Sequence, residues 1–163
     1  MLRLMLAAAL AFAVPSLAEA RIFKLGTPVV ASVDLPANWK PTAIEAGVEA
    51  VSPDEEIYLA VEVASVASAE KAVTEALEYL LKQGVKVDDK TVKQTEGTIN
   101  GMPLFEISAK GQDDDGAETD ISVAVAVVNE TTMLVLTYWG SETGEKNHAE
   151  TLVKIAQSLK KAG

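Results

Sequence analysis

Seven segments of the chain have the composition or the two-residue alternation of apolar and polar positions that is typical of β-strands. The predicted strands cover residues 29–35, 44–51, 56–64, 91–99, 104–111, 118–128 and 132–139. Turn residues separate neighbouring strands: Pro53 and Asp54 follow the second strand, and Asn100-Gly101, a strong hairpin signal, follows the fourth. We therefore expect an early hairpin and, later in the chain, a four-stranded antiparallel meander.

The apolar period changes to about 3.6 residues in two segments, which predicts two helices. The first covers residues 68–83, with Ser68 as a suitable N-cap and Gly84 as a C-terminal stop. The second covers residues 145–161 and ends in two lysines, which suit the negative C-terminal end of a helix. The element order β-β-β-α-β-β-β-β-α predicts an α+β fold, with a largely antiparallel sheet of about seven strands and two main helices.

The strands of the predicted meander have two unlike faces. One face carries branched and aromatic side chains: Phe105, Ile107, Ile121, Val123, Val125 and Val127. The opposite face carries smaller or more polar side chains: Glu106, Ser108, Ser122, Ala124 and Ala126. The first face needs a helix packed against it. The second face is compatible with a closely packed second helix or with a shallow exposed groove, and the sequence leaves both arrangements open.

The first twenty residues predict export. Arg3 precedes an apolar run over residues 4–14, and small residues follow around Ala18 and Ala20, which is the order of a secretory signal. The run is shorter than the roughly 20 residues that a membrane-spanning helix needs. We therefore expect residues 1–20 to be a signal peptide, cleaved after Ala18 or Ala20, and a periplasmic or secreted protein without membrane insertion of the mature chain.

Length and composition limit the kinds of fold and partner that are expected for residues 21–163. A chain of this length is expected to form a single domain, and because the sequence contains no cysteine, its stability has to come from a packed core. The full sequence contains 24 acidic and 14 basic residues, for a net charge of −10 at pH 7. Such a charge repels phosphate backbones, so nucleic acid is excluded as an expected partner, whereas a basic protein or a cation is favoured electrostatically.

Several short motifs occur in the order found in one known family. They are Leu35-Pro36-Ala37-Asn38-Trp39, the turn Ser52-Pro53-Asp54, the predicted helix of about 16 residues, the hairpin pair Asn100-Gly101, and Ser158-Leu159 in the closing helix. In these features the chain resembles the PsbP-like family. The resemblance implies an α/β/α sandwich, in which helices cover both faces of an antiparallel sheet. It also implies a binding-type role, because members of that family mostly bind other proteins and share no catalytic residues.

The residues that could carry catalysis or bind a metal do not form a known pattern. His148 is the only histidine, and the chain has neither a cysteine nor a Gly-x-Ser-x-Gly motif, which disfavours a zinc site and a serine nucleophile. The acidic run 113–115 suggests calcium. However, an EF-hand loop that began there would have Ala117 and Ala124 at positions that require oxygen ligands. We therefore predict no catalytic residue, no metal site and no cofactor.

The function favoured by these observations is that of a non-catalytic periplasmic binding or accessory protein, with another envelope protein as its partner. The partner would contact the small-residue face of the sheet or the loops around Trp39 and Trp139, because large aromatic residues often dominate binding energy. The candidate partner-binding residues are Trp39, Tyr58, Glu62, Glu106, Tyr138 and Trp139.

Two other functions stay open. The first alternative is a carrier of a small apolar ligand, lodged between helix and sheet where Ala60, Ala124 and Ala126 would leave room. The second, which is less favoured, is a hydrolytic enzyme that uses Glu62 and Glu106 as an acid–base pair across neighbouring strands.

Overall fold

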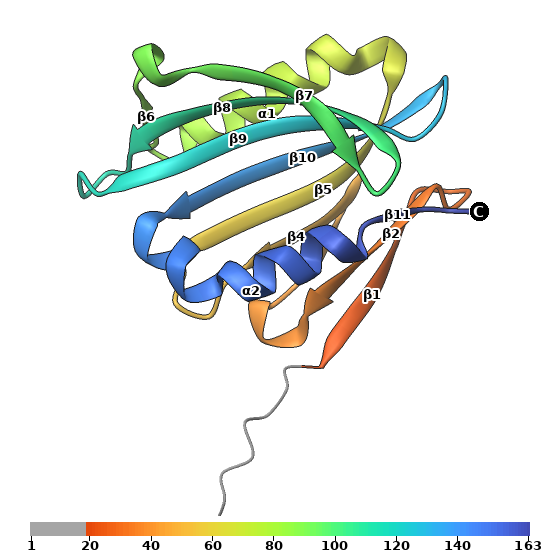
Figure 1. Ribbon diagram of the computed structural model, residues 1–163, viewed down its shortest axis with the longest axis horizontal. Coiled ribbons are helices and arrows are strands. Elements are labelled where there is room, and N and C mark those ends of the chain that lie inside the picture. The colour runs from red at the N-terminus through yellow and green to blue at the C-terminus, as the bar shows by residue number, and fades with distance from the viewer. Residues whose placement is uncertain (1–18) are drawn as a thin grey trace, which may run out of the picture.

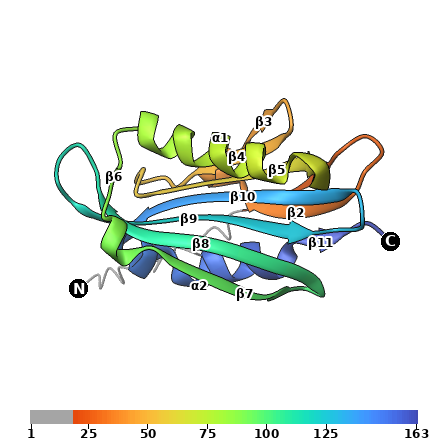
Figure 2. The ribbon, with the colours of Figure 1, turned by 90° about the horizontal axis from the view of Figure 1, so that it is seen from above.

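The computed structural model describes residues 19–163, so the predicted signal peptide lies outside the described residues except for its last two positions. Helix α1 (Ala69–Lys82), an eight-stranded antiparallel sheet and helix α2 (Glu142–Ser158) form three layers (Figure 1, Figure 2). In spatial order, the strands of the large sheet are β3 (Thr42–Ile44), β4 (Gly47–Val51), β5 (Ile57–Ser65), β10 (Thr132–Ser141), β9 (Glu118–Val127), β8 (Met102–Gln112), β6 (Lys86–Val87) and β7 (Lys93–Ile99). Both β6 and β7 pair with β8.

A second, three-stranded sheet lies on the same side of the large sheet as α2 (Figure 2). Its strands are β1 (Ala20–Leu25), β2 (Ala31–Pro36) and β11 (Lys160–Lys161), with β2 in the centre. Leu25, Val33 and Leu35 of this sheet share one hydrophobic core with residues of α2 and the large sheet. Within residues 19–163, no helix is both long and apolar enough to cross a membrane.

The face of the large sheet that α1 covers, which we call the α1 face, carries the branched aliphatic residues of the meander. The buried residues of its core are Ala76, Leu80, Val85, Ala109, Ile121, Val123, Met133 and Val135. The sequence prediction that this face needs a helix against it is therefore confirmed. One side of α1, with Val73, Leu77 and Leu80, lies over the meander, and the side with Ala72, Ala76 and Tyr79 lies toward β5.

The opposite face, which we call the α2 face, is covered as well. Ala124 and Ala126 are 6% and 0% exposed, respectively, and Val61 and Leu134 beside them belong to the core that includes Ile155 of α2. The small side chains of β9 allow this layer to approach the sheet closely. The structure thus resolves the open alternative: the alanines lie under a second layer, as the α/β/α sandwich requires.

The α+β class, the two helices and the antiparallel meander β7-β8-β9-β10 are confirmed, whereas the end of the last helix was predicted wrongly. Helix α2 ends at Ser158, and the two lysines that follow Leu159 form β11 instead of a last helical turn. The cause is a contact from far along the chain. The side-chain amide of Asn100 donates to the carbonyl oxygens of Ala156 (2.8 Å) and Leu159 (2.7 Å) and so satisfies the helix end.

Candidate functional site

A cleft lies on the α1 face, between α1 and the edge formed by β3, β4 and β5. Its volume is about 640 Å³, within the range of binding pockets for small molecules and side chains. The lining residues are Ile44, Ala46, Glu49, Tyr58, Glu62, Val63, Ala64, Ser65, Ser68, Lys71, Ala72, Glu75, Ala76, Tyr79, Val135 and Thr137. We call this the acidic cleft.

The alternation of β5 and the period of α1 place these side chains together. In β5, Tyr58 and Glu62 point to the α1 face, while Leu59 and Val61 enter the core of the α2 face. In α1, Ala72, Ala76 and Tyr79 follow one another at three- and four-residue spacings and therefore lie on one side of the helix. Because the two alanines are small, space remains between the helix and the strand.

A pair of tyrosines lines the acidic cleft. The rings of Tyr58 and Tyr79 lie 5.5 Å apart between centroids and are tilted by 33°. The Tyr58 hydroxyl donates a hydrogen bond to Glu49 Oε2 over 3.1 Å. Burial raises the pKa of Tyr58 above its usual value, and Tyr79 and Glu49 raise it further. Tyr58 therefore stays a protonated donor that holds the Glu49 carboxylate in place.

The negative charges of the carboxylates in the cleft are not equally neutralised by nearby cationic side chains. Glu75 forms an ion pair with Lys71 at 3.4 Å on the exposed surface of α1. Glu62 is half-buried, and among the described residues no Lys, Arg or His lies within ion-pair distance of it. Burial raises the pKa of Glu62, and the charges of Glu49 and Glu75 raise it further. The cleft therefore holds an excess of negative charge that a bound cation would compensate.

Thr137 adds a polar group to the lining of the cleft. The residue is 3% exposed, and a threonine hydroxyl can both donate and accept a hydrogen bond. Within residues 19–163, no three His, Asp or Glu side chains lie close enough together to hold a metal ion.

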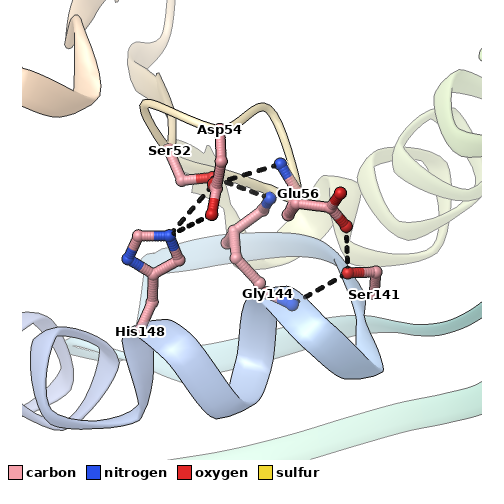
Figure 3. Close-up of polar contacts among 7 residues, drawn as sticks. Ser52, Asp54, Glu56, Ser141, Gly144 and His148 are labelled. Carbon is pink, nitrogen blue, oxygen red and sulfur yellow. Dashed lines mark hydrogen bonds and ion pairs between the residues drawn. The ribbon is translucent and has the colours of Figure 1, made fainter.

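A second polar cluster lies at the other end of the β4–β5 hairpin, where its turn meets α2 (Figure 3). Asp54 is the centre of this cluster: it accepts a hydrogen bond from the Ser52 hydroxyl at 2.6 Å and contacts His148 Nε2 at 2.9 Å. The Ser52 hydrogen bond, followed by those of His148 and the Glu56 N–H, lowers the pKa of Asp54 to about 2. Serine, aspartate and histidine thus meet, but not as a catalytic triad, because the serine donates to the carboxylate and not to the histidine.

The same turn also contacts the first turn of α2. Ser141 caps this helix by accepting a hydrogen bond from the Gly144 N–H at 2.9 Å, and its hydroxyl donates to the Glu56 carboxylate (Figure 3). Gly144 lies so close to Glu56 that a Cβ on Gly144 would come within 2.6 Å of the Glu56 Cβ. These residues, together with Ser52, Asp54 and His148, join the hairpin to α2. We call them the clasp.

Apart from Tyr58, the three other aromatic candidates from the sequence lie in three different environments. Trp39 is 1% exposed and contacts His148 edge to face, with centroids 5.3 Å apart, so it belongs to the core and is not the exposed anchor that was expected. Tyr138 lies on the α2 face and donates to Glu145 of α2 at 3.0 Å. Trp139 lies on the α1 face opposite Tyr58, and its buried indole N–H has no partner among the described residues.

Two groupings expected from the sequence are wrong: the acid–base pair of Glu62 and Glu106, and the cavity lined by Ala60, Ala124 and Ala126. Glu62 lies on the α1 face, whereas Glu106, opposite Ala124, lies on the α2 face, with β10 and β9 between their strands. They cannot act as an acid–base pair. Ala60 faces α1, while Ala124 and Ala126 face the other layer, so these alanines share no cavity. Both errors arose because the sequence pattern does not say which face of one strand matches which face of another.

The structure also adds residues that the sequence pattern did not single out. Glu49, Glu75 and Tyr79 line the acidic cleft beside the expected Tyr58 and Glu62. Strand alternation and helical spacing show which residues share a face of an element, but not whether that face is exposed or packed inside the protein. Only the tertiary arrangement shows that α1 meets the first hairpin.

The acidic run at 113–115 forms an ordinary turn between β8 and β9. Asp113 Oδ1 accepts hydrogen bonds from the backbone N–H groups of Asp115 (2.9 Å) and Ala117 (2.8 Å). Gly116 adopts a φ of +84°, a left-handed conformation that suits glycine. The run therefore forms a turn that is stabilised by its own backbone contacts.

Comparisons with known proteins support the fold. No model of a protein family matches the sequence, and no curated protein matches it either. Among solved structures, cyanobacterial PsbP (CyanoP) from Synechocystis is similar over 95% of this chain and 100% of its own, with a TM-score of 0.58 and 11% identity. LpqN of Mycobacterium tuberculosis, described as involved in cell envelope biogenesis, is similar over 82% and 83%, with a TM-score of 0.53 and 11% identity. The chain therefore has a PsbP-like fold, as the sequence motifs indicated.

Proposed function

We propose that this protein is a non-catalytic accessory protein that works outside the cytoplasm and binds another envelope protein through the acidic cleft. One observation carries the proposal: a cleft of about 640 Å³ that combines an aromatic pair with the half-buried carboxylate of Glu62, for which residues 19–163 provide no cationic partner. Clefts of this kind, apolar in part and with a few converging polar groups, are the usual form of binding sites.

Two further observations support a role outside the cytoplasm. The first is the order of charged, apolar and small residues at the N-terminus, which is that of a secretory signal. The second is the fold itself, which is shared with an envelope-biogenesis protein and with cyanobacterial PsbP. A binding role without catalysis is supported by the clasp, in which Ser52 donates to Asp54 and not to His148, and by the separation of Glu62 from Glu106.

Site-specific photo-crosslinking tests this proposal. A photoreactive phenylalanine analogue is placed at Tyr79, at the mouth of the cleft, and in a second sample at Glu96, which is exposed on the edge strand β7. After irradiation of intact cells of the source organism, we expect a discrete crosslinked product, identified by mass spectrometry, from position 79 and none from position 96. Equal products from both positions, or none from position 79, would contradict the assignment of the cleft.

A second candidate function, carriage of a small apolar ligand, is favoured by a separate pocket. This pocket, of about 280 Å³, lies under the C-terminal half of α1, and its lining includes Leu77, Ile107 and Ile121. Leu81 and Val92 at its rim are 54% and 45% exposed. Native mass spectrometry of the purified protein distinguishes this function, because a carrier would retain a bound lipid or metabolite that Leu77→Gln abolishes.

A further inference from the structure

We propose that the acidic cleft recognises lysine or arginine side chains, presented by a basic peptide segment of the partner protein. This inference rests on the proposed function and specifies the chemistry of its ligand. It joins three properties of the cleft, namely its charge, its apolar wall and the acidic surface that continues beyond it.

The charge of the cleft selects for a cation. Glu49, Glu62 and Glu75 contribute three carboxylates against one ammonium group, that of Lys71, and Lys71 is already paired with Glu75. A lysine or arginine head group that entered the cleft would find Glu62 without a competing partner in the described chain. Thr137 also lines the cleft, and its hydroxyl can accept a hydrogen bond from such a head group.

The apolar wall selects for a cation on an aliphatic stem. Ala46, Ala64, Ala72 and Ala76 line the cleft between the charged groups, and their methyl groups offer surface to a chain of methylene groups. Lysine and arginine bury such stems while their charged heads remain in a polar environment. Tyr79 is 37% exposed and stacked near Tyr58, so a ring face is available for a cation–π contact. A bare metal ion would use none of these features.

The surroundings favour a peptide over a single small amine. A shallow depression of about 520 Å³ on the outer side of α1 shares Ser68, Lys71 and Glu75 with the cleft and adds Glu70 and Glu78. Acidic groups therefore continue from the cleft across the exposed side of the helix. A segment with several basic residues could place one side chain in the cleft and others on this surface, whereas a single amine would fill only part of the available volume.

The test uses a defined probe: an acetylated, amidated peptide in which three lysines alternate with alanine, together with its arginine counterpart. Binding to the purified protein is followed by two-dimensional ¹H–¹⁵N NMR up to millimolar peptide. We expect the amide signals of β5 and α1 around the cleft to shift, and we expect the same peptide with acetylated lysines to cause no shift. Absence of binding by both basic peptides, or equal binding of the acetylated peptide, would overturn the inference.

Matched variants separate recognition from general attraction to an acidic protein. Glu62→Gln and Glu106→Gln change the net charge by the same amount, but only Glu62 lines the cleft. We expect Glu62→Gln to weaken peptide binding about fivefold and Glu106→Gln to change it less than twofold. Equal weakening by both variants would overturn the inference. A partner crosslinked from position 79, combined with failure of the basic peptides, would disprove this ligand chemistry and leave the proposed function standing.

Discussion

The clasp and the acidic cleft are built from the same β4–β5 hairpin, yet their carboxylates are in opposite conditions. In the clasp, Asp54 accepts hydrogen bonds from Ser52 and contacts His148, and its pKa is lowered to about 2. In the cleft, Glu62 has no cationic partner among the described residues, and burial near Glu49 raises its pKa. One hairpin thus carries a compensated acid on one side of the sheet and an uncompensated acid on the other.

The difference separates a structural role from a binding role. A hydrogen-bonded carboxylate favours the folded state, because its charged form is better solvated by its partners than by water alone in the unfolded chain. A half-buried carboxylate without a partner opposes folding, because it loses water and gains no equivalent contact. The clasp therefore stabilises the contact between the hairpin and α2, while the cleft retains an unfavourable group that a ligand can compensate.

The largest difference in stability is expected between two aromatic residues: Trp39, which contacts the clasp, and Tyr79, which lines the cleft. Trp39→Ala removes a side chain that is 1% exposed and packs against His148, so we expect the free energy of unfolding to fall by about 3–5 kcal/mol. Tyr79→Ala removes a side chain that is 37% exposed, so we expect a loss of less than about 1 kcal/mol. Urea denaturation of both variants measures the difference. Similar losses would show that Tyr79 is as structural as Trp39.

The Trp39 example shows what the sequence could and could not predict. Local periodicity was enough for α1, for the meander and for the alternation of Tyr58 and Glu62 along β5, because these properties depend on neighbouring residues. The same periodicity did not reveal that the loop of Trp39 folds back onto α2. Burial of Trp39 depends on a contact with His148, more than one hundred residues away, and no local pattern encodes such a contact.

The missed strands have the same cause. Strand β1 is mostly exposed, so its apolar pattern is weak, and it forms because β2 pairs with it from Ala20↔Pro36 to Leu25↔Ala31. Strand β11 has only two residues and forms on the other edge of β2 after Asn100 ends α2. The acidic cleft belongs to this class of features. Each of its residues lies on a predicted element, but their meeting depends on where α1 crosses the sheet.

The second largest effect is expected for the central residue of the clasp. Asp54→Asn keeps the shape of the side chain and removes its charge, so the contacts with Ser52 and His148 weaken. Because 38% of the Asp54 side chain is exposed, solvent screens these contacts, and we expect a loss of about 1 kcal/mol in the free energy of unfolding. Glu55→Gln, in the same turn, is the matched control and should change stability by less than about 0.5 kcal/mol. Equal effects would contradict the central role of Asp54.

The pH dependence of this effect has a definite sign. The pKa of Asp54 falls from 3.8 to about 2 on folding, so its stabilising contribution is complete above about pH 4 and is lost as the pH falls toward 2. We therefore expect the difference in stability between the wild type and Asp54→Asn to shrink over this interval. Urea denaturation at a series of pH values measures it. A difference that stays constant down to pH 2 would mean that ionisation of Asp54 is not what holds the clasp.

The smallest expected effect on stability is a gain, whereas the substitutions above are expected to cause losses. Glu62→Gln removes an uncompensated charge, so we expect the free energy of unfolding at pH 7 to rise by a few tenths of a kcal/mol. Folding raises the pKa of Glu62 above 4.5, so its charge destabilises the folded state only as the pH rises through the pKa of Glu62 in the folded protein. The gain in the free energy of unfolding from Glu62→Gln should therefore vanish below about pH 4.5.

Glu106→Gln, on the other face of the sheet, should leave stability unchanged at both pH values. If Glu62→Gln instead destabilised the protein at neutral pH, Glu62 would have a structural partner, and the contrast between the cleft and the clasp would be lost. A small gain at pH 7 together with weaker binding of a basic peptide would show that the protein keeps Glu62 for its ligand and not for its fold.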